Sequence, residues 1–321
     1  IGKGTRFMKK QLKADLMLIV VTLCWGISYY LMDVCLSDMG AFTLNAYRFI
    51  GAFVIAGVLM YPKLKTVNKI TLKYSCLVGM ALVFVYIGAT FGVQYTTLSN
   101  SGFLCALTVV FTPMFGFIFF KRRPEKKLIL VVTMCFVGIA LLTLKDDFSI
   151  NLANLKGDLL CIGGGMAYAI DLLLTEKAVS HEEVNPLQLG VFQLGVTGIL
   201  NVVLAIFLEE PHLPSSSNVW MAVIFLSVFC TGVAFIVQAV AQKYTSASHV
   251  GVIFTLEPVF CSISAFFLVG EVLSPKSYLG AFIMLASIFI MEVDFKFLKK
   301  DHKNIDEKQI ENIDDNDKLI L

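Results

Sequence analysis

The chain has 321 residues, of which 57% are hydrophobic and only 16% are charged. A soluble protein is about 25% charged, so this composition excludes an ordinary soluble domain and predicts a membrane protein. The net charge of +2 is too small to indicate binding to nucleic acid.

Ten stretches of about 20 apolar residues, each enough to cross roughly 30 Å of hydrocarbon, follow one another with short connections. They lie near residues 15–34, 42–61, 72–92, 97–120, 128–144, 157–176, 187–208, 218–240, 247–269 and 277–293. Residues 1–14 are predicted to be a cytoplasmic segment, and residues 1–7 to be added sequence because Met8 resembles a natural start. Residues 294–321 are dominated by charged and polar residues, which predicts a solvated, disordered cytoplasmic tail.

The distribution of lysine and arginine predicts the orientation, because these residues favour the cytoplasmic side. If the N-terminus is cytoplasmic, the outer connections hold only Lys145, Lys156 and Lys276 of the 26 lysines and arginines, and Arg48 lies within a span. All the others fall on the inner side. The sequence therefore predicts a multi-pass protein of the cell (inner) membrane with both termini in the cytoplasm.

The two halves of the chain repeat one another. Residues 95–103 and 244–252 each open an apolar stretch with small and polar residues, and adding 149 to a number in the first gives its match in the second. Spans one and six match at an offset of 143. These offsets place Tyr95 on Tyr244, Gly102 on Gly251, Trp25 on Tyr168 and Ser28 on Asp171.

Each half then has five spans, residues 15–144 and residues 157–293, joined by an outer linker at residues 145–156. Because five is an odd number, the second copy is inverted relative to the first. The predicted fold is an all-α membrane protein of ten transmembrane helices, built as two inverted five-helix repeats. Inverted repeats place a substrate site near the bilayer midplane, between the halves.

Several short motifs occur in the same order as in a known family. They are Leu23-Cys24-Trp25-Gly26 in span one, Arg48 in span two, Gln94-Tyr95-Thr96-Thr97 before span four, Leu256-Glu257-Pro258 in span nine and Gly270-Glu271 at its end. Over residues 12–293 the chain resembles the ten-span, EamA-like members of the drug/metabolite transporter superfamily. The resemblance implies a secondary transporter, often an exporter of amino acids or other small metabolites, with a cavity lined by spans one to four and six to nine. One difference is Lys121-Arg122 at the end of span four, where family members often carry Gly-Glu.

Three charged residues within the spans are candidates for function, because a charge inside a membrane costs roughly 2.5–3.5 kcal/mol on insertion scales. Glu257 is either a proton or cation site or a carboxyl group that caps backbone groups freed by Pro258. Asp171 is either a substrate or proton ligand or a partly hydrated residue near the cytoplasmic mouth. Arg48 is suited to hold a substrate carboxylate with two hydrogen bonds. The favoured interpretation is that it snorkels to the outer interface or bonds carbonyls at a helix end, with Asp33 solvated or paired with it.

Uncharged side chains supply the other candidates for the cavity. Trp25 and Tyr168, which the repeat matches, are predicted either to form walls for a flat, apolar or cationic solute or to pack against other helices. The remaining candidates are polar residues that line a cavity or bond across helices, namely Ser28, Thr90, Gln94, Gln193 and Gln238.

Small residues form matching stripes on spans four and nine, at the spacing that puts them on one face of a helix. Two inverted helices with such stripes approach closely and slide, as a gate requires, although static packing explains the stripes about equally well. The candidate residues for gating or packing are Ser99, Gly102, Pro113, Ser248, Gly251 and Pro258.

The chain has no HExxH, GxSxG or GxxxxGK motif, so the sequence predicts neither an enzyme nor direct use of ATP. Its eight cysteines form no CxxC pair and are interpreted as apolar fillers, and no metal or cofactor is predicted. The predicted function is secondary transport of a small metabolite, amino acids first, by alternating access, with protons as the candidate coupling ion and export favoured by the resemblance. The alternatives are a flippase for a lipid-linked substrate and a non-transporting receptor or scaffold. The protein is expected to work as a monomer or homodimer among membrane lipids.

Overall fold

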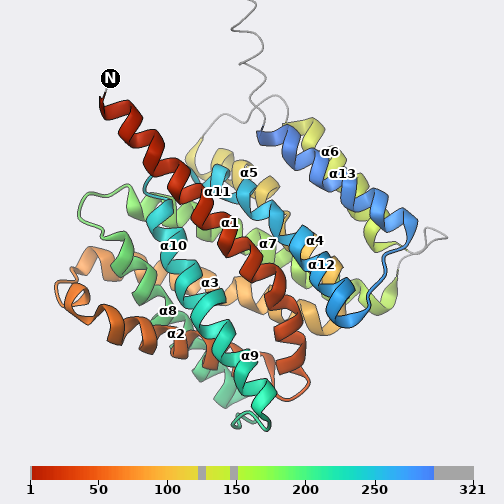
Figure 1. Cartoon of the computed structure of the whole chain (residues 1–321), viewed down its shortest axis with the longest axis horizontal. Coiled ribbons are helices and arrows are strands. Elements are labelled where there is room, and N and C mark those ends of the chain that lie inside the picture. Colours follow the sequence, from red (N-terminus) through yellow and green to blue (C-terminus); the bar gives the residue numbers. More distant parts are fainter. Residues whose placement is uncertain (1, 122–127, 145–150, 293–321) are drawn as a thin grey trace, which may run out of the picture.

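The computed structural model describes residues 2–121, 128–144 and 151–292, and every element in this part of the chain is a helix (Figure 1). In chain order the elements are α1 (Gly2–Leu36), α2 (Ala41–Leu64), α3 (Lys69–Tyr95), α4 (Leu98–Cys105), α5 (Thr108–Phe120), α6 (Leu128–Thr143), α7 (Leu152–Val179), α8 (Pro186–Leu208), α9 (Ser217–Ser227), η1 (Val228–Val233), α10 (Ala234–Ala241), α11 (Ala247–Ile253), η2 (Phe254–Leu256), α12 (Glu257–Val269) and α13 (Pro275–Glu292). Two of them are not α-helices, because η1 is a π-helix and η2 is a 3₁₀-helix.

Seven helical segments of the described chain are long and apolar enough to cross a membrane. They are Lys13–Leu36, Ala41–Leu64, Lys69–Tyr95, Leu98–Phe120, Leu152–Val179, Pro186–Leu208 and Ser217–Ala241, and they coincide with predicted spans one to four and six to eight. The protein is therefore a multi-pass, helical membrane protein. The other three predicted spans fall on α6, on α11 to α12 and on α13, so the count of ten spans stays a prediction.

The first helix begins earlier than the sequence predicts. Helix α1 starts at Gly2 and runs without a break into the first span, so residues 2–14 are helical instead of forming a separate segment. The stretch before the span contains Lys, Gln, Leu and Ala, which favour helix. Figure 1 shows this end of α1 extending past its neighbours. The predicted tail, residues 294–321, and residues 145–150 of the predicted linker lie outside the described part of the chain.

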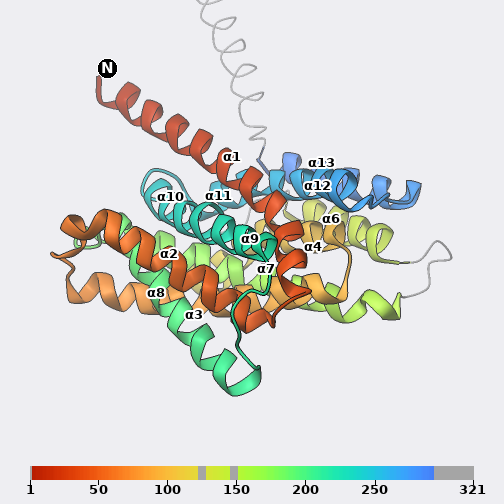
Figure 2. The same ribbon diagram turned by 60° about the horizontal axis from the view of Figure 1, so that its bottom comes forward.

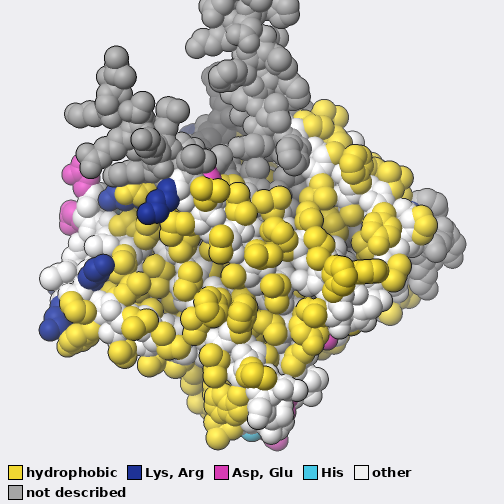
Figure 3. Space-filling view, viewed as in Figure 1, with side chains coloured by type: hydrophobic (Ala, Val, Ile, Leu, Met, Phe, Trp, Pro, Cys, Tyr) yellow, Lys and Arg dark blue, Asp and Glu magenta, His cyan; other side chains and the backbone are white. Residues whose placement is uncertain are grey.

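The surface is mostly apolar, as expected where lipid takes the place of water. Hydrophobic side chains cover most of the described face in Figure 3, and the Lys and Arg side chains visible there lie toward its left-hand border. Large side chains such as Phe207 (80% exposed) and Phe267 (77% exposed) point outward. Apolar patches of this extent are rare on soluble monomers, so this surface faces the hydrocarbon of a membrane.

Contacts between the two halves of the chain build the interior. Helix α3 packs on α7, α2 on α8, and α1 on both α12 and the α9–η1–α10 segment. Helices α6 and α13 lie side by side at one edge of the molecule in both ribbon views (Figures 1 and 2). The core therefore lies between the halves, and α6 and α13 are peripheral to it.

Predicted spans four and nine are both broken in the middle. The sequence predicts a bend in span nine, at Pro258, but none in span four. The break separates α4 from α5 in one, and α11 from α12, through η2, in the other. The offset of 149 carries Thr108 and Phe120, the ends of α5, onto Glu257 and Val269, the ends of α12.

The ends of these half-helices also match. Lys121 after α5 and Gly270 after α12 are related by the same offset, and both adopt a left-handed conformation, with φ of 53° and 72°. Glycine adopts this conformation without strain, whereas lysine does not. The two halves therefore keep one backbone geometry at a position where their sequences differ.

The cause of the break differs between the two copies. In span nine, Pro258 has no N–H to donate to the carbonyl of Phe254, and a 3₁₀ turn precedes it. In span four no proline lies at the break. The backbone tightens there into bonds of three-residue spacing, from the N–H of Leu107 to the carbonyl of Leu104 (3.2 Å) and from that of Val109 to the carbonyl of Ala106 (3.1 Å), and the hydroxyl of Thr108 lies within hydrogen-bond distance of the carbonyl of Gly165 on α7 (3.0 Å).

Candidate functional site

A cavity of about 60 Å³ lies where the two broken helices meet α1, α2, α3, α7 and α10. Both halves of the chain line it. Its walls include Trp25, Ser28, Tyr29, Met32, Arg48, Tyr86, Cys105, Thr108, Tyr168, Phe235, Gly251, Phe254 and Glu257. Broken helices at the centre of a transporter expose backbone and polar groups at membrane depth, where a substrate can reach them. This cavity is therefore the candidate functional site.

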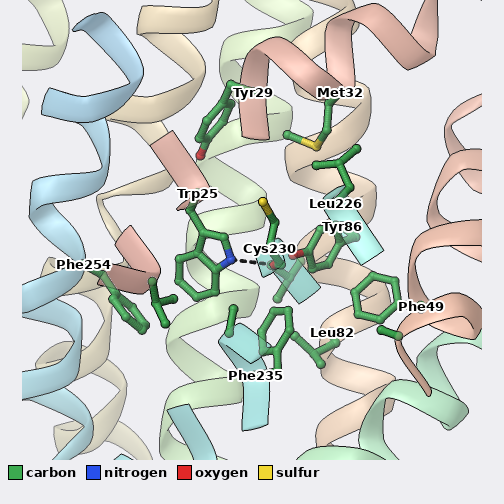
Figure 4. Packing of buried hydrophobic residues seen from close by; sticks show 14 of the residues in the cluster. Trp25, Tyr29, Met32, Phe49, Leu82, Tyr86, Leu226, Cys230, Phe235 and Phe254 are labelled. Carbon is green, nitrogen blue, oxygen red and sulfur yellow. Dashed lines mark hydrogen bonds between the residues drawn. The ribbon is translucent and has the colours of Figure 1, made fainter. Parts of the chain in front are cut away.

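Aromatic side chains surround Trp25 at this site (Figure 4). Its ring lies 4.7 Å from that of Phe254, 5.6 Å from that of Phe235 and 5.8 Å from that of Tyr168, measured between ring centroids. Tyr168 in turn stacks on Phe254 at 6.0 Å. The two aromatic residues that the repeat matches, Trp25 and Tyr168, thus come together in one wall.

The π-helix η1 holds two side chains of the cavity. The indole N–H of Trp25 donates to the carbonyl of Cys230 (2.7 Å), the bond drawn as a dashed line in Figure 4. Arg48 donates from Nε to the hydroxyl of Thr231 (2.9 Å). A π-helical turn often occurs at functional sites, and here it fixes residues from α1 and α2 in place.

Arg48 lies inside the protein, with only 1% of its surface exposed. Besides Thr231, it donates from Nη1 to the sulfur of Met32 (3.3 Å), and its guanidinium lies 4.6 Å over the ring of Tyr86. Within the described chain these polar contacts are a hydroxyl and a thioether, not a carboxylate. The favoured interpretation, that Arg48 snorkels to the outer interface, is therefore wrong, because its face of α2 meets the core and not lipid. Asp33 is exposed and is not its partner.

Glu257 is the negative group of the same cavity. It is the first residue of α12, and one of its oxygens accepts a hydrogen bond from the hydroxyl of Tyr29 (2.7 Å). Tyr29 and Met32 lie about one turn apart on α1, so α1 contacts Glu257 through one of them and Arg48 through the other. The cavity therefore has a cation on one flank and a carboxyl group on the other, each with a neutral hydrogen-bond partner.

The other predicted cavity residues divide into three groups. Ser28 lines the cavity, but its hydroxyl donates to the carbonyl of Trp25 (2.7 Å). Thr90, Asp171 and Gln238 are buried behind the walls: Thr90 donates to Asn45 (3.1 Å), and Gln238 bonds both Tyr168 and Asp171.

Two predicted cavity residues lie elsewhere. Gln94 is exposed, because it comes five residues after the cavity residue Ala89 and so points about 140° away around α3. Gln193 is buried on α8, where its backbone carbonyl faces Gly79 of α3, and it is absent from the cavity wall.

The predicted gate residues lie where spans four and nine cross. A Cβ on Gly102 would come within 2.9 Å of Cys261 and 3.4 Å of Pro258. A Cβ on Gly251 would come within 3.6 Å of Val109. Adding 149 to Gly102 and Val109 gives Gly251 and Pro258, so the two contacts are equivalent, but the contact at Gly102 is the tighter one.

The remaining gate candidates flank this crossing. Ser99 is buried and donates its backbone N–H to Glu271 (3.3 Å), which gives the Gly-Glu pair after α12 a contact at the start of α4. Ser248 is half-buried on α11, and Pro113 lies within α5, more than a turn past the break. Neither Ser248 nor Pro113 lines the cavity.

Several cavity residues were not predicted. Tyr29 follows Trp25 by four positions and Phe254 precedes Glu257 by three, so helical spacing from those two candidates was a usable signal. The same spacing relates Tyr86 to Thr90, four positions later, and Phe235 to Gln238, three positions later, so the polar candidates marked these aromatic residues as well.

Comparison with known proteins agrees with the fold. A sequence profile of the EamA-like transporter family matches residues 12–144 and 155–293. An uncharacterized transporter of Archaeoglobus fulgidus is 29% identical over 286 residues, which cover 88% of this chain and 87% of the relative. A second uncharacterized transporter of that archaeon is 24% identical over 282 residues, covering 87% and 96%.

A crystal structure of a protein with 15% sequence identity superposes with a TM-score of 0.67, over 87% of this chain and 96% of that chain. At that identity the likeness shows the fold alone. The family profile, in contrast, matches each half of the chain over nearly its whole length. This chain belongs to the EamA-like transporter family and is a multi-pass membrane transporter.

Proposed function

We propose that this transporter carries an amino acid with an apolar side chain across the membrane by alternating access. The observation that supports this substrate most directly is the pairing of Arg48 and Glu257 on one cavity. Each is bonded to neutral groups and neither is bonded to the other. A buried charge without a counter-charge is costly, and a zwitterion would supply both counter-charges at once.

The walls of the cavity fit the rest of such a molecule. The guanidinium of Arg48 would hold the substrate carboxylate, and Glu257 would hold the ammonium group. Trp25, Phe235 and Phe254 would then contact an apolar side chain, and their ring faces favour a nearby ammonium group as well.

The size of the cavity supports a mechanism in which it opens and closes. At about 60 Å³ it has room for about four water molecules, whereas ligand pockets span about 300–1,000 Å³. A substrate therefore enters only when the helices around the cavity separate. This conformation corresponds to a closed stage of the transport cycle.

The contacts between helices support an inverted repeat of ten spans. The repeat relates α1 to α7, α3 to the α9–η1–α10 segment, and α5 to α12. The contact of α3 with α7 therefore has its counterpart in the contact of α1 with α9–η1–α10. Likewise, the contact of α1 with α12 has its counterpart in the contact of α7 with α5. The pairs α2–α8 and α6–α13 map onto themselves. This pattern is expected for a two-fold axis in the membrane plane, which would let one half adopt the conformation of the other and so reverse the access of the site.

The lysine and arginine pattern supports an orientation in the cell (inner) membrane with both termini in the cytoplasm. Export remains the favoured direction through the family alone, and protons remain the candidate coupling ion.

Polar contacts join connections at both ends of the helices, such as Asn68 to the carbonyl of Glu183 (2.6 Å) at the inner end and Asp38 to the N–H of Ser215 (3.0 Å) at the outer end. Either set can close one side of the cavity.

Exchange in liposomes tests the proposal. Liposomes containing the full chain and unlabelled amino acid are mixed with radiolabelled L-leucine or L-phenylalanine, and we expect uptake of the label above that of protein-free liposomes. Glu257→Gln should raise the half-saturating concentration about 10- to 100-fold, because a charge-assisted hydrogen bond contributes about 1.5–3 kcal/mol. Gln94→Ala, at the exposed position, is the control and should behave as the unaltered protein.

The outcome that contradicts the proposal is equally specific. If neither amino acid exchanges in liposomes that contain folded protein, the substrate assignment is wrong. Movement of a lipid-linked sugar in the same liposomes would then support the flippase instead.

A further inference from the structure

Asp171 lies on α7 behind the cavity wall, with none of its surface exposed. One of its oxygens accepts a hydrogen bond from Nε2 of Gln238 (3.3 Å), and the other has no partner in the described structure. The hydroxyl of Thr175, about one turn further along α7, is buried and also lacks a partner. A carboxylate needs several donors or a cation when it is buried, and Asp171 has one neutral donor.

No cation compensates Asp171 within the described part of the chain. The elements packed on α7 include α3, α4, α5, α10 and α11. The one cation of the cavity wall, Arg48 of α2, bonds Thr231 and Met32 and not Asp171. The other titratable groups toward the cavity are Tyr86, Cys105, Tyr168 and Glu257. All of these are neutral or acidic. Lys177, the next cation along α7, lies over the ring of Phe120 (5.7 Å), and the side chain of His249 on α11 is outside the described part.

A chain of hydrogen bonds connects Asp171 to the cavity. The hydroxyl of Tyr168 donates to Oε1 of Gln238 (2.6 Å), and Nε2 of Gln238 donates to Asp171. The ring of Tyr168 is part of the wall, stacked on Phe254 and in edge contact with Trp25. Ser28, the residue that the repeat matches to Asp171, only bonds its own helix. The chain of bonds is thus particular to the second half.

We propose that Asp171 is the proton site of this transporter, separate from the substrate site, and that Gln238 and Tyr168 connect the two. This inference rests on the proposed function and adds the identity of the coupling group. In the closed conformation Asp171 is a neutral carboxylic acid. A substrate that enters the narrow cavity displaces Tyr168, which breaks the bond to Gln238 and lets Gln238 turn.

The proton step is a simple ionisation. When one side of the protein opens, the O–H bond of the carboxylic acid breaks, and the proton passes to water that enters from that side. The electron pair stays on the carboxylate, which keeps the hydrogen bond from Nε2 of Gln238, and Gln238, no longer bonded to Tyr168, is free to turn further toward it. Reprotonation from the other side returns the neutral acid, so one proton moves in each cycle.

The decisive variant is Asp171→Asn, because the amide keeps the size of the side chain and cannot ionise. In liposomes it should still exchange L-leucine or L-phenylalanine, but accumulation driven by a pH gradient should fall to the level without a gradient. Proton release on addition of amino acid to purified protein in weakly buffered detergent should fall from about one per chain to none. Asp33→Asn, at an exposed carboxyl group in α1, is the control and should keep both properties.

A second measurement does not depend on the substrate. The infrared spectrum of the unaltered protein near neutral pH should contain the C=O band of a protonated carboxylic acid that Asp171→Asn removes and Asp33→Asn leaves. Gln238→Met should keep this band and abolish the proton release that amino acid triggers. If the band survives in Asp171→Asn, or if that variant still accumulates substrate along a pH gradient, Asp171 is not the proton site. Absence of exchange in the unaltered protein would instead contradict the proposed substrate, and the infrared band would still decide the protonation of Asp171.

Discussion

At the scale of single residues, the side chains best able to bind a substrate are those that the fold leaves with unused hydrogen-bond donors or acceptors. Arg48 has five N–H donors, of which one bonds Thr231 and one bonds the sulfur of Met32. Its planar group also lies over Tyr86. These contacts depend on the planar geometry of the guanidinium group as well as on its positive charge.

Arg48→Lys tests that conclusion. Lysine keeps the charge but loses the Nε bond to Thr231 and the flat contact with Tyr86. We expect amino acid affinity in a binding assay to weaken about 10-fold or more, because a hydrogen bond to a charged group contributes about 1.5–3 kcal/mol. Unchanged affinity in Arg48→Lys would show that a point charge is sufficient there.

A second prediction concerns a carboxylate outside the cavity. Glu209 follows α8 and accepts hydrogen bonds from the backbone N–H groups of Phe42 (2.9 Å) and Thr43 (2.8 Å), so it caps α2, whose own N-cap residue is Gly40. Glu209→Ala should lower the free energy of unfolding by about 1 kcal/mol, measured as a lower melting temperature in detergent. Glu210→Ala, at the exposed next position, should leave the melting temperature unchanged; equal effects of both variants would contradict the cap.

At the scale of elements, close approach of helix backbones decides the packing. A Cβ on Gly88 of α3 would lie 2.4 Å from the Cα of Gly164 on α7, so the glycine pattern at Gly88 and Gly92 is a packing face. Gly163, next to Gly164 on α7, has nothing within 4 Å of an added Cβ. Close packing of α3 on α7 therefore requires glycine at Gly164 but not at the adjacent Gly163.

Gly88→Ala and Gly163→Ala should change stability in opposite directions. Overpacking costs about 1–3 kcal/mol, so Gly88→Ala should lower the melting temperature and the yield of folded protein. Gly163→Ala removes a glycine from a helix interior without a clash and should stabilise it by up to about 1 kcal/mol. A lower melting temperature in both variants would contradict the assigned contact.

The crossing of spans four and nine provides the prediction for the gate. The contact at Gly102, toward the predicted outer side, is tight, while the equivalent inner contact at Gly251 is looser. An added methyl group at Gly102 should therefore oppose closure of the outer side, whereas one at Gly251 is in ordinary van der Waals contact and should leave closure of the inner side unchanged.

Labelling of Cys105, which lines the cavity, measures the effect when it is the only cysteine left. With a membrane-impermeant thiol reagent added outside, Gly102→Ala should raise the labelling rate. Gly251→Ala, whose added methyl group makes no clash, is the matched control and should leave the rate unchanged. The population shift should be about 10-fold if the clash costs about 1.4 kcal/mol. Equal rates in folded samples of both variants would leave the stripes as static packing.

At the scale of the whole molecule, several features of the two halves lie at equivalent positions of the sequence. The matched breaks, the matched left-handed residues Lys121 and Gly270 and the equivalent contacts of Gly102 and Gly251 all follow the offset of 149. The side chains at matched positions differ, as with Asp171 in the second half and Ser28 in the first. This difference would let one half carry the proton while both halves hold the substrate.

The predicted topology is tested with single cysteines in a background without native thiols. Ser216 and Lys65 are exposed residues in connections at opposite ends of the helices. Ser216→Cys should be labelled from outside the cell by an impermeant reagent, and Lys65→Cys only after the membrane is permeabilised. Labelling of both from the same side would exclude the proposed orientation.

The sequence by itself determined the helices, the membrane setting and the offset between the halves. These properties are local or periodic: a span needs about 20 apolar residues whatever surrounds it, and a repeat is visible in the numbering. For the same reason Trp25, Tyr168 and Glu257 were marked in the sequence, by the repeat or by a charge inside a span, and all three line one cavity in the structure.

Only the tertiary structure decided which way each helix faces. In a soluble helix the polar face marks the solvent side, but lipid is as apolar as the core, so α2 and α3 carry little pattern to distinguish the two. That is why the buried position of Arg48 and the exposed position of Gln94 were both assigned wrongly. The bend at Pro258 in span nine was predicted from the proline, whereas the break in span four was missed because no proline marks it. There α4 and α5 both pack on α7, and these contacts join residues far apart in the chain.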